Sequence, residues 1–201
     1  MSRDAARIIG LYDRHALRWD RDRSRHLFER PWLDRFLALL PAQASVLDIG
    51  CGCGEPLARY IIERGHRLTG VDSSSSMIAV CERRFPQAVW QLADMRALSL
   101  ERVFDGILAW DSFFHLTPDD QRQMFVIFEA HAAAGAALMF TSGPRFGVAM
   151  GQYGGEPLYH ASLDPEEYRR LLGAHGFEVV SFVPEDPACG GHTVWLARRG
   201  A

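Results

Sequence analysis

The chain has 201 residues and a formal net charge of −3, with 48% hydrophobic and 23% charged residues. This length suits one core, so we expect a single domain over residues 1–201. The composition is that of an ordinary globular protein without a membrane-spanning run, and the negative charge gives no general attraction to nucleic acid. The opening residues form no signal peptide, which predicts a cytoplasmic location.

Two helices are predicted before the first strand. Over residues 4–28, apolar side chains that include Tyr12 and Trp19 recur at helical spacing, and arginines and aspartates occupy the other face. Residues 31–40 begin with proline, carry an apolar face and end before Pro41. The second helix should therefore pack against a sheet.

A glycine loop follows the first predicted strand. Residues 45–49 are an apolar run typical of a buried parallel strand, and Gly50, Gly52 and Gly54 come next. Glycine permits positive φ and lets a ligand lie against the backbone, while Pro56 suits the start of a helix. Strand, glycine loop and helix together predict a nucleotide-type pocket.

The charges near this loop favour a cationic ligand. The spacing is G-x-G-x-G rather than the dinucleotide pattern G-x-G-x-x-G, and Asp48 and Glu55 would repel a phosphate. S-adenosylmethionine (SAM) carries a sulfonium and an ammonium group and no phosphate. Here the sequence resembles the class I SAM-dependent methyltransferases, whose first motif (D/E)-x-G-x-G-x-G is matched by Asp48, Gly50, Gly52 and Gly54.

The resemblance extends over about residues 42–199 and implies the fold. It implies an α/β, doubly wound, Rossmann-like sheet of seven strands, mostly parallel with an antiparallel last strand, and helices on both faces. In small-molecule members of this family an N-terminal segment commonly caps the active site, so residues 1–41 are expected to form a helical cap. Tyr12 and Trp19 would then line the substrate pocket, with ordinary packing as the alternative.

An acid ends the second predicted strand. Residues 68–72 are an apolar run that ends in Asp72, at the offset from the glycine loop where a carboxylate can accept from both ribose hydroxyls. The alternative role for Asp72 is the N-cap of the helix predicted over residues 75–85. The joint spacing favours ribose binding.

Another acid follows the third predicted strand, residues 88–92. In the resembling family an acid and an apolar residue at this place meet the adenine, and Asp94 and Met95 match them. The cofactor contacts implied by the resemblance are Asp48, Gly50, Cys51, Gly52, Gly54, Asp72, Ser73, Asp94, Met95 and Trp110.

The fourth predicted strand, residues 104–111, leads into a segment expected to face cofactor and acceptor. Ligands of open α/β sheets lie beyond the carboxyl ends of the strands, which places Trp110 to His115 at the site. Nucleic-acid methyltransferases that modify adenine N6 carry (D/N)-P-P-(Y/F) here. Asp111-Ser112-Phe113-Phe114 lacks the prolines, which argues against a base-flipping enzyme.

A long glycine-rich segment, residues 143–163, separates the fifth predicted strand from the last helix. Long loops in compact domains are often functional, so this segment is our candidate lid. Residues 177–183 and 192–198 are predicted as the final two strands and, without a helix between them, they should pair antiparallel or lie apart.

Methyl transfer from a sulfonium is an in-line displacement in which holding the acceptor in near-attack geometry supplies most of the catalysis. If the acceptor must lose a proton, His115 is the first candidate base and His160 the second. Asp111 could orient the acceptor or the cofactor's ammonium group. The predicted acceptor is a small, partly apolar or aromatic molecule, and its predicted contacts are Tyr12, Trp19, Phe113, Phe114, Tyr153, Tyr159 and His160.

Other functions are less consistent with these patterns. A nicotinamide-dependent oxidoreductase would need phosphate-compatible glycine spacing and a Tyr-x-x-x-Lys donor, and the chain contains no lysine. A non-catalytic SAM-binding module would keep cofactor binding and lack turnover. No metal site is predicted, because Cys51-x-Cys53 is too short for the usual motif and Cys189 with His192 lacks a second pair. The chain is expected to act as a monomer or homodimer.

Overall fold

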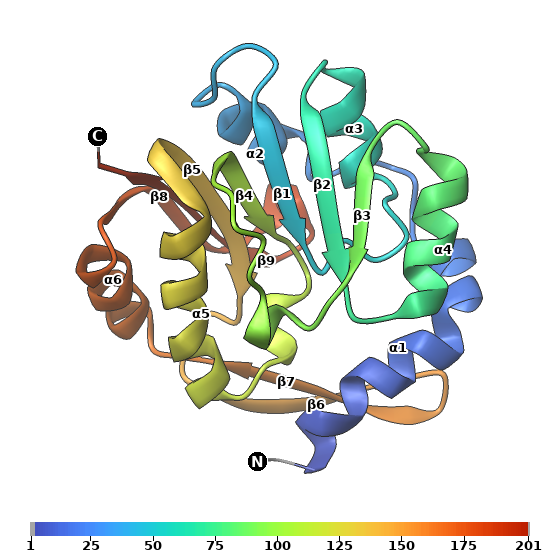
Figure 1. The fold of residues 1–201 in the computed structure, drawn as a ribbon. Helices are drawn as coiled ribbons and strands as arrows, with labels where there is room; N and C mark the ends of the chain where they lie inside the picture. The colour runs from blue at the N-terminus through green and yellow to red at the C-terminus, as the bar shows by residue number, and fades with distance from the viewer. Residues whose placement is uncertain (1–2, 201) are drawn as a thin grey trace.

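The computed structural model describes residues 3–200 and centres on one large sheet (Figure 1). Its seven strands have the order β3-β2-β1-β4-β5-β9-β8. Strand β9 is antiparallel to β5 and to β8, and the pairs among β1 to β5 are parallel. The predicted fold class, including the antiparallel last strand, is confirmed.

The elements follow one another as in a doubly wound α/β fold. The strands of the large sheet are β1 (Ser45–Ile49), β2 (Arg67–Asp72), β3 (Val89–Leu92), β4 (Phe104–Ala109), β5 (Ala132–Ser142), β8 (Phe177–Asp186) and β9 (His192–Arg199). The helices are α1 (Arg3–Asp22), α2 (Arg30–Leu37), α3 (Leu57–Glu63), α4 (Ser75–Arg84), α5 (Pro118–His131) and α6 (Pro165–Ala174). Three short 3-10 turns are η1 (Met95–Ala97), η2 (Phe113–His115) and η3 (Pro187–Cys189).

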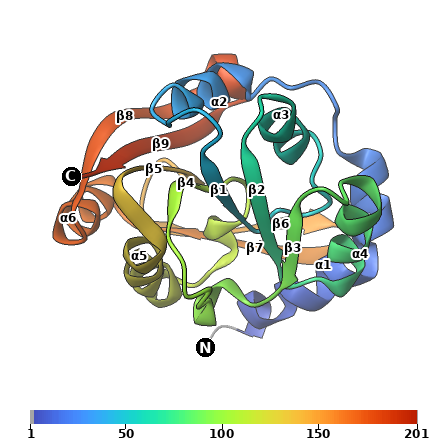
Figure 2. The same cartoon turned by 45° about the horizontal axis from the view of Figure 1, so that its top comes forward.

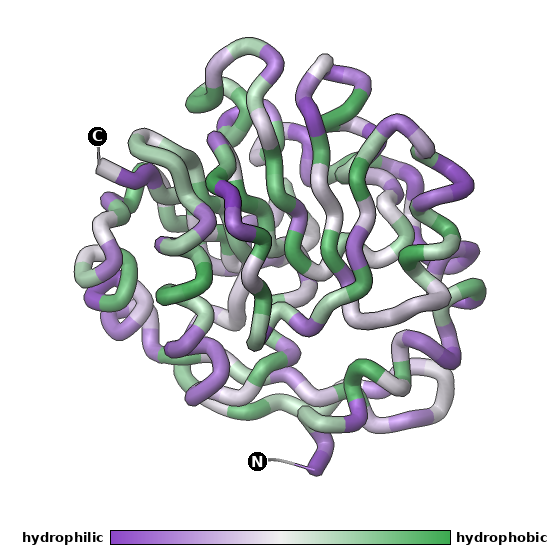
Figure 3. The backbone as a smooth tube through the Cα atoms, viewed as in Figure 1, coloured by the Kyte–Doolittle hydropathy of each residue, from purple (hydrophilic) through white to green (hydrophobic). Residues whose placement is uncertain are grey.

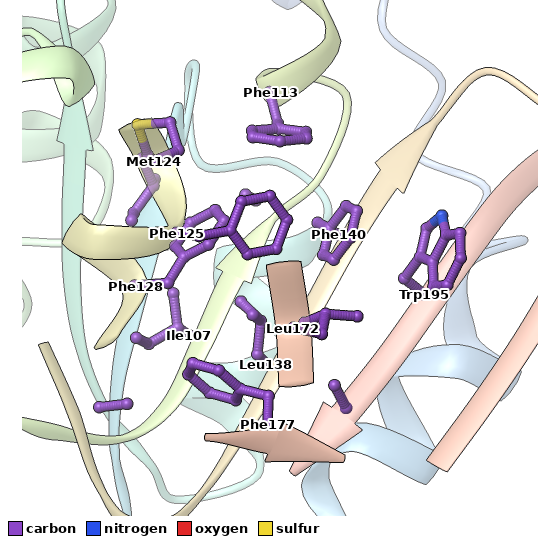
Figure 4. Close-up of a cluster of buried hydrophobic side chains, with 14 of the residues drawn as sticks. Ile107, Phe113, Met124, Phe125, Phe128, Leu138, Phe140, Leu172, Phe177 and Trp195 are labelled. Atoms are coloured by element: carbon purple, nitrogen blue, oxygen red, sulfur yellow. The ribbon is translucent and has the colours of Figure 1, made fainter. Parts of the chain in front are cut away.

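Apolar side chains on the two faces of the sheet form two cores. Successive residues of a strand point to opposite faces, so Ile107 joins the core beneath α5 and α6, whereas Leu108 joins the core beneath α2 and α3. Figure 2 shows these helix pairs on opposite sides of the sheet, and Figure 4 shows the aromatic core beside α5. In Figure 3 the strands at the centre carry much of the hydrophobic colour. Burial of these side chains therefore determines which helices cover each face of the sheet.

The segment predicted as a long loop, residues 143–163, is in fact mostly a hairpin. Strands β6 (Gly147–Tyr153) and β7 (Glu156–Ser162) pair antiparallel and form a separate two-stranded sheet. Gly154 and Gly155 connect them with φ of +61° and +87°, as a two-residue hairpin turn that matches strand twist requires. The Gly-Gly pair was the signal for this hairpin.

Helix α1 is shorter than predicted. The expected helix over residues 4–28 ends at Asp22, although the backbone N–H of Arg23 still donates to Trp19. The hydroxyl of Ser24 accepts from the backbone N–H of His26, a local hydrogen bond that competes with helix continuation. Within residues 3–200, no helix has the length and apolar character that a membrane crossing requires.

Helix α1 and the hairpin lie together at the carboxyl edge of the sheet. In Figure 1 the arrowheads of β1 and β2 point toward this pair. Glu156 of β7 accepts from Arg14 at 2.5 Å and lies 2.9 Å from Nε2 of His15. On the other side of α1, Asp13 accepts from the backbone N–H of Ser76, and Asp20 accepts from Arg84. The helix is therefore fastened to both the hairpin and α4.

Candidate functional site

A pocket opens where the carboxyl ends of β1, β2 and β4 face helix α1. Its lining includes every residue predicted to contact the cofactor, together with Tyr12, Trp19, Asp111 and His115. The predicted cofactor contacts brought together here are Asp48, Gly50, Cys51, Gly52, Gly54, Asp72, Ser73, Asp94, Met95 and Trp110.

The glycine loop leaves no room for side chains at its ends. Gly50 and Gly54 have φ of +77° and +79°, a region that other residues rarely adopt. A Cβ on Gly50 would lie 2.2 Å from the Cβ of Ser112, and one on Gly54 would lie 2.9 Å from the ring of Phe85. The backbone of this loop is therefore exposed to whatever fills the pocket.

Asp72 is held by backbone donors and is not the cap of helix α4. Its carboxylate accepts from the N–H groups of Gly52 and Ser74, both at 2.9 Å. The N-cap is Ser74, whose hydroxyl accepts from the N–H of Met77 at 3.2 Å. Burial raises the pKa of Asp72, and the backbone donors oppose that rise. The capping alternative is thus wrong, and Asp72 faces the pocket.

Asp48 adds a second buried carboxyl group at the same end. It is 4% exposed, and burial together with the nearby charge of Asp72 raises its pKa to about 7. Two carboxyl groups in so little water favour a cation near them.

Asp94 forms an ion pair with a residue that the sequence reading did not single out. The carboxylate accepts from the backbone N–H of Arg96 at 3.0 Å and from its guanidinium. These hydrogen bonds hold the pKa of Asp94 below its usual value. Arg96 also lines the pocket, two residues after the predicted adenine contact.

Arg23 is a second missed residue. It lines the pocket and its guanidinium is hydrogen-bonded to Glu29, which is fully buried. No short motif marks this pair, because both residues lie in the irregular segment between α1 and α2.

His115 is a neutral histidine within a hydrogen-bonded chain. Its Nδ1 lies 2.8 Å from the carbonyl oxygen of Tyr159, and its Nε2 lies 2.9 Å from the hydroxyl of Tyr12. A carbonyl can only accept, so Nδ1 carries the hydrogen and Nε2 accepts from Tyr12. Burial lowers the pKa of His115 to about 4 and raises that of Tyr12.

Asp111 follows β4 with a backbone that is unusual for a residue other than glycine. Its φ is +50°, and its N–H donates to the hydroxyl of Thr141 at 2.9 Å. One carboxylate oxygen, Oδ1, lies 3.0 Å from Nε2 of His192. The sequence reading considered His192 as a metal ligand and did not connect it with Asp111.

Aromatic rings surround the hydroxyl of Tyr12. Its ring is 5.3 Å from that of Trp19 and stacks at 6.4 Å on Tyr153. Phe114 and His160 lie behind His115, with ring centroids 4.9 Å from it. Of the seven predicted substrate contacts, Tyr12 and Trp19 line the pocket, and Phe114, Tyr153 and His160 form a second layer.

Two predicted substrate contacts are packed elsewhere. Phe113 is fully buried in the core, 5.2 Å from the ring of Phe140, because η2 directs it toward the sheet. The prediction for Phe113 is therefore wrong. Tyr159 is 4% exposed and packs with Ile8 and Ala161, and its backbone carbonyl, rather than its phenol, reaches His115.

No group of three potential metal ligands converges within the described residues 3–200.

Comparison with known proteins gives the same class. Residues 46–135 match the family model of the methyltransferase domain. A dTDP-3-amino-3,6-dideoxy-alpha-D-glucopyranose N,N-dimethyltransferase from Streptomyces fradiae is 35% identical over 94 residues, which are 46% of this chain and 36% of that protein. A trans-aconitate 2-methyltransferase from Azoarcus sp. (strain BH72) is 40% identical over 68 residues, 33% of this chain and 26% of that protein. The matches thus span only about a third of these relatives.

Solved structures show the same fold over nearly the whole chain. The Burkholderia thailandensis 1,6-didemethyltoxoflavin-N1-methyltransferase, with bound 1,6-didemethyltoxoflavin and S-adenosylhomocysteine, aligns with a TM-score of 0.75 and 22% identity, covering 100% of this chain and 92% of that chain. CalS10, an amino pentose methyltransferase from Micromonospora echinaspora in its SAM-bound form, aligns with a TM-score of 0.72 and 20% identity, covering 92% and 96%.

The strand order and the glycine loop at the carboxyl edge define an open α/β sheet with a nucleotide-type pocket. Residues 46–135 resemble the methyltransferase domain in sequence, and the chain as a whole has the fold of the SAM-dependent methyltransferases among the solved structures.

Proposed function

We propose that this protein binds SAM and transfers its methyl group to a small-molecule acceptor by in-line displacement. The observation that carries the proposal is the pairing of a glycine loop that excludes side chains with the carboxyl groups of Asp48 and Asp72. This arrangement suits a cationic nucleoside without phosphate. It equally disfavours a nicotinamide dinucleotide, whose pyrophosphate would meet these acids.

The residues fit SAM at several points. The Asp72 carboxylate would accept from the ribose hydroxyls, and Asp94 with Met95 would meet the adenine. The loop from Gly50 to Gly54 would let the cofactor lie against the backbone. Solved relatives with this fold are complexes with SAM or S-adenosylhomocysteine.

The acceptor side favours a nucleophile that needs little help from a base. Both nitrogens of His115 are already hydrogen-bonded and its pKa is about 4, which makes it a weak base. We therefore place His115 and Tyr12 in an orienting role, and any proton would reach Nε2 through the Tyr12 hydroxyl. A neutral amine is nucleophilic without prior deprotonation, unlike an alcohol.

The charge of the pocket also argues against an anionic acceptor. The two arginines in the lining, Arg23 and Arg96, are each paired with a carboxylate. The acidic side chains in the lining are Asp48, Glu55, Asp72, Asp94, Asp111 and Asp120. A neutral amine acceptor, such as the amino sugars named for two relatives, brings no negative charge to this acidic lining, whereas a carboxylate would be repelled by it.

Helix α1 and the hairpin β6–β7 would act as the cover of the acceptor site. Tyr12 and Trp19 reach the pocket from α1, and Tyr153 of the hairpin stacks behind them. We therefore retain the segment 143–163 as a lid, now as a hairpin.

Calorimetric titration with SAM, S-adenosylhomocysteine and NADH tests the cofactor. Binding of the first two and not of NADH is expected, and binding of NADH alone would overturn the proposal.

Asp72→Ala should weaken SAM binding by more than about tenfold, because it removes a charged acceptor of two hydrogen bonds. Ser74→Ala, which removes the cap of α4, is the matched control and should lower stability with little change in affinity. Equal affinities in Asp72→Ala and wild type would remove Asp72 from the site.

A further inference from the structure

His192, the first residue of β9, lies between two aromatic rings and two hydrogen-bond acceptors. Its ring is 5.4 Å from Trp110 and 5.6 Å from Phe28. Its Nδ1 lies 2.6 Å from the carbonyl oxygen of Cys189, and its Nε2 lies 3.0 Å from Oδ1 of Asp111. Because a carbonyl can only accept, Nδ1 carries a hydrogen, and the carboxylate 3.0 Å from Nε2 favours the imidazolium form of the ring as an ion pair.

Asp111 depends on this partner for its position. Its backbone adopts a left-handed φ of +50°, which costs free energy for a residue with a Cβ. The hydroxyl of Thr141 accepts from the N–H of Asp111, and Nε2 of His192 lies 3.0 Å from its carboxylate oxygen Oδ1. The carboxylate lines the pocket and lies close enough to Tyr12 and His115 to raise the pKa of Tyr12 and to oppose the fall in that of His115.

Two other carboxyl residues lie around His192, and Glu29 is the one that acts on its pKa. Glu29 is fully buried, and its negative charge helps to raise the pKa of His192, although one of its oxygens is paired with Arg23. Asp186 lies opposite His192 in the register of β8 and β9, and its carboxylate accepts from Trp32 and from the backbone of Ala188. Burial of the ring opposes the charge, but the hydrogen bond and charge of Asp111 outweigh it, so the pKa of His192 is raised.

We propose that His192 is a positioning residue of the methyl-transfer site, whose imidazolium fixes the Asp111 carboxylate toward the sulfonium and ammonium groups of SAM. The contact between His192 and Asp111 is seen in the structure itself and does not depend on the proposed function. Its consequence for SAM rests on the proposed function. His192 itself does not line the pocket, so it acts through Asp111.

Nuclear magnetic resonance titration of the histidine rings tests the contact without any ligand. In the wild type, His192 should titrate above the ordinary histidine pKa of about 6.5. In Asp111→Asn it should titrate below its wild-type value, because burial then acts without the carboxylate. A wild-type His192 that titrates at or below the ordinary value, or one unmoved by Asp111→Asn, would overturn the proposal.

SAM affinity tests the consequence. His192→Phe keeps an aromatic ring between Trp110 and Phe28 but cannot donate to Asp111, and it should raise the dissociation constant for SAM about tenfold at pH 6. The ratio of the variant and wild-type constants should approach one as the pH rises past the pKa of His192, because the wild type then loses the same ion pair. Asp48 titrates in both proteins, so the ratio removes its effect.

His175→Phe is the matched control. His175 also pairs with a carboxylate, Glu129 at 2.6 Å, and stacks on Phe125, but neither residue lines the pocket. The control should bind SAM as the wild type does. A wild-type protein that fails to bind SAM refutes the proposed function, whereas wild-type affinity in His192→Phe at every pH refutes the positioning role alone.

Discussion

Two histidines flank the pocket, and their surroundings shift their pKa values in opposite directions. His115 and His192 each direct Nδ1 at a backbone carbonyl; His115 is buried and His192 is partly buried. They differ at Nε2, where His115 meets the hydroxyl of Tyr12 and His192 meets the carboxylate of Asp111. A hydroxyl is neutral and can donate, whereas a carboxylate is negative, so the neutral ring is favoured at His115 and the charged ring at His192. Burial lowers the pKa of both histidines, and the difference in the partner at Nε2 therefore accounts for the opposite shifts.

The largest expected effect comes from acid acting on His115. The pKa of His115 is about 4 in the folded protein and about 6.5 in the unfolded chain, so unfolding binds a proton between these values. Stability is therefore lost as the pH falls from 6.5 to 4, by about 3 kcal/mol from this residue. In His115→Gln, which does not titrate, the loss between pH 7 and pH 4 should be smaller by that amount. Urea unfolding across this range measures it, and identical losses in the two proteins would show that His115 is already charged.

The effect of His192→Phe should have the opposite pH dependence. A raised folded pKa gives stability that is present at pH 6 and is lost as the pH rises through that pKa. We expect the variant to be less stable by roughly 1.5–3 kcal/mol at pH 6, the range for hydrogen bonds to charged groups, with a smaller gap at pH 9. Urea unfolding at the two values measures the gap. A gap that does not change with pH would trace the loss to packing and not to charge.

A smaller effect is expected from the hydroxyl that keeps His115 neutral. Tyr12→Phe retains the ring contacts with Trp19 and Tyr153 but removes the donor to Nε2, which should cost about 1 kcal/mol. Tyr153→Phe is the control, because the buried hydroxyl of Tyr153 has no hydrogen-bond partner among the described residues. Its removal should leave stability unchanged or raised. Equal losses in the two variants would remove the Tyr12 hydrogen bond as a cause.

The glycine-loop end of the pocket could be predicted from sequence because its residues follow one another along strands and turns. Asp48 and the glycines form one local motif, and Asp72 ends the next strand. The opposite end, around Tyr12 and His115, is assembled from distant segments, and the contact between Asp111 and His192 likewise has no local signal. Phe113 was misassigned because its direction depends on how η2 packs on the core, which the alternation of residue types does not reveal.

The ion pairs that connect helix α1 to the hairpin and to α4 affect how quickly a ligand can enter and leave the pocket. Arg14 pairs with Glu156 on the hairpin, and Asp20 pairs with Arg84 on α4, so the helix that covers the pocket is tied across it by partly exposed ion pairs. Dissolved salt screens such pairs, while burial protects the contacts deeper in the pocket. Ionic strength should therefore change the rates at which a ligand enters and leaves the pocket more than it changes the equilibrium affinity of the pocket for that ligand.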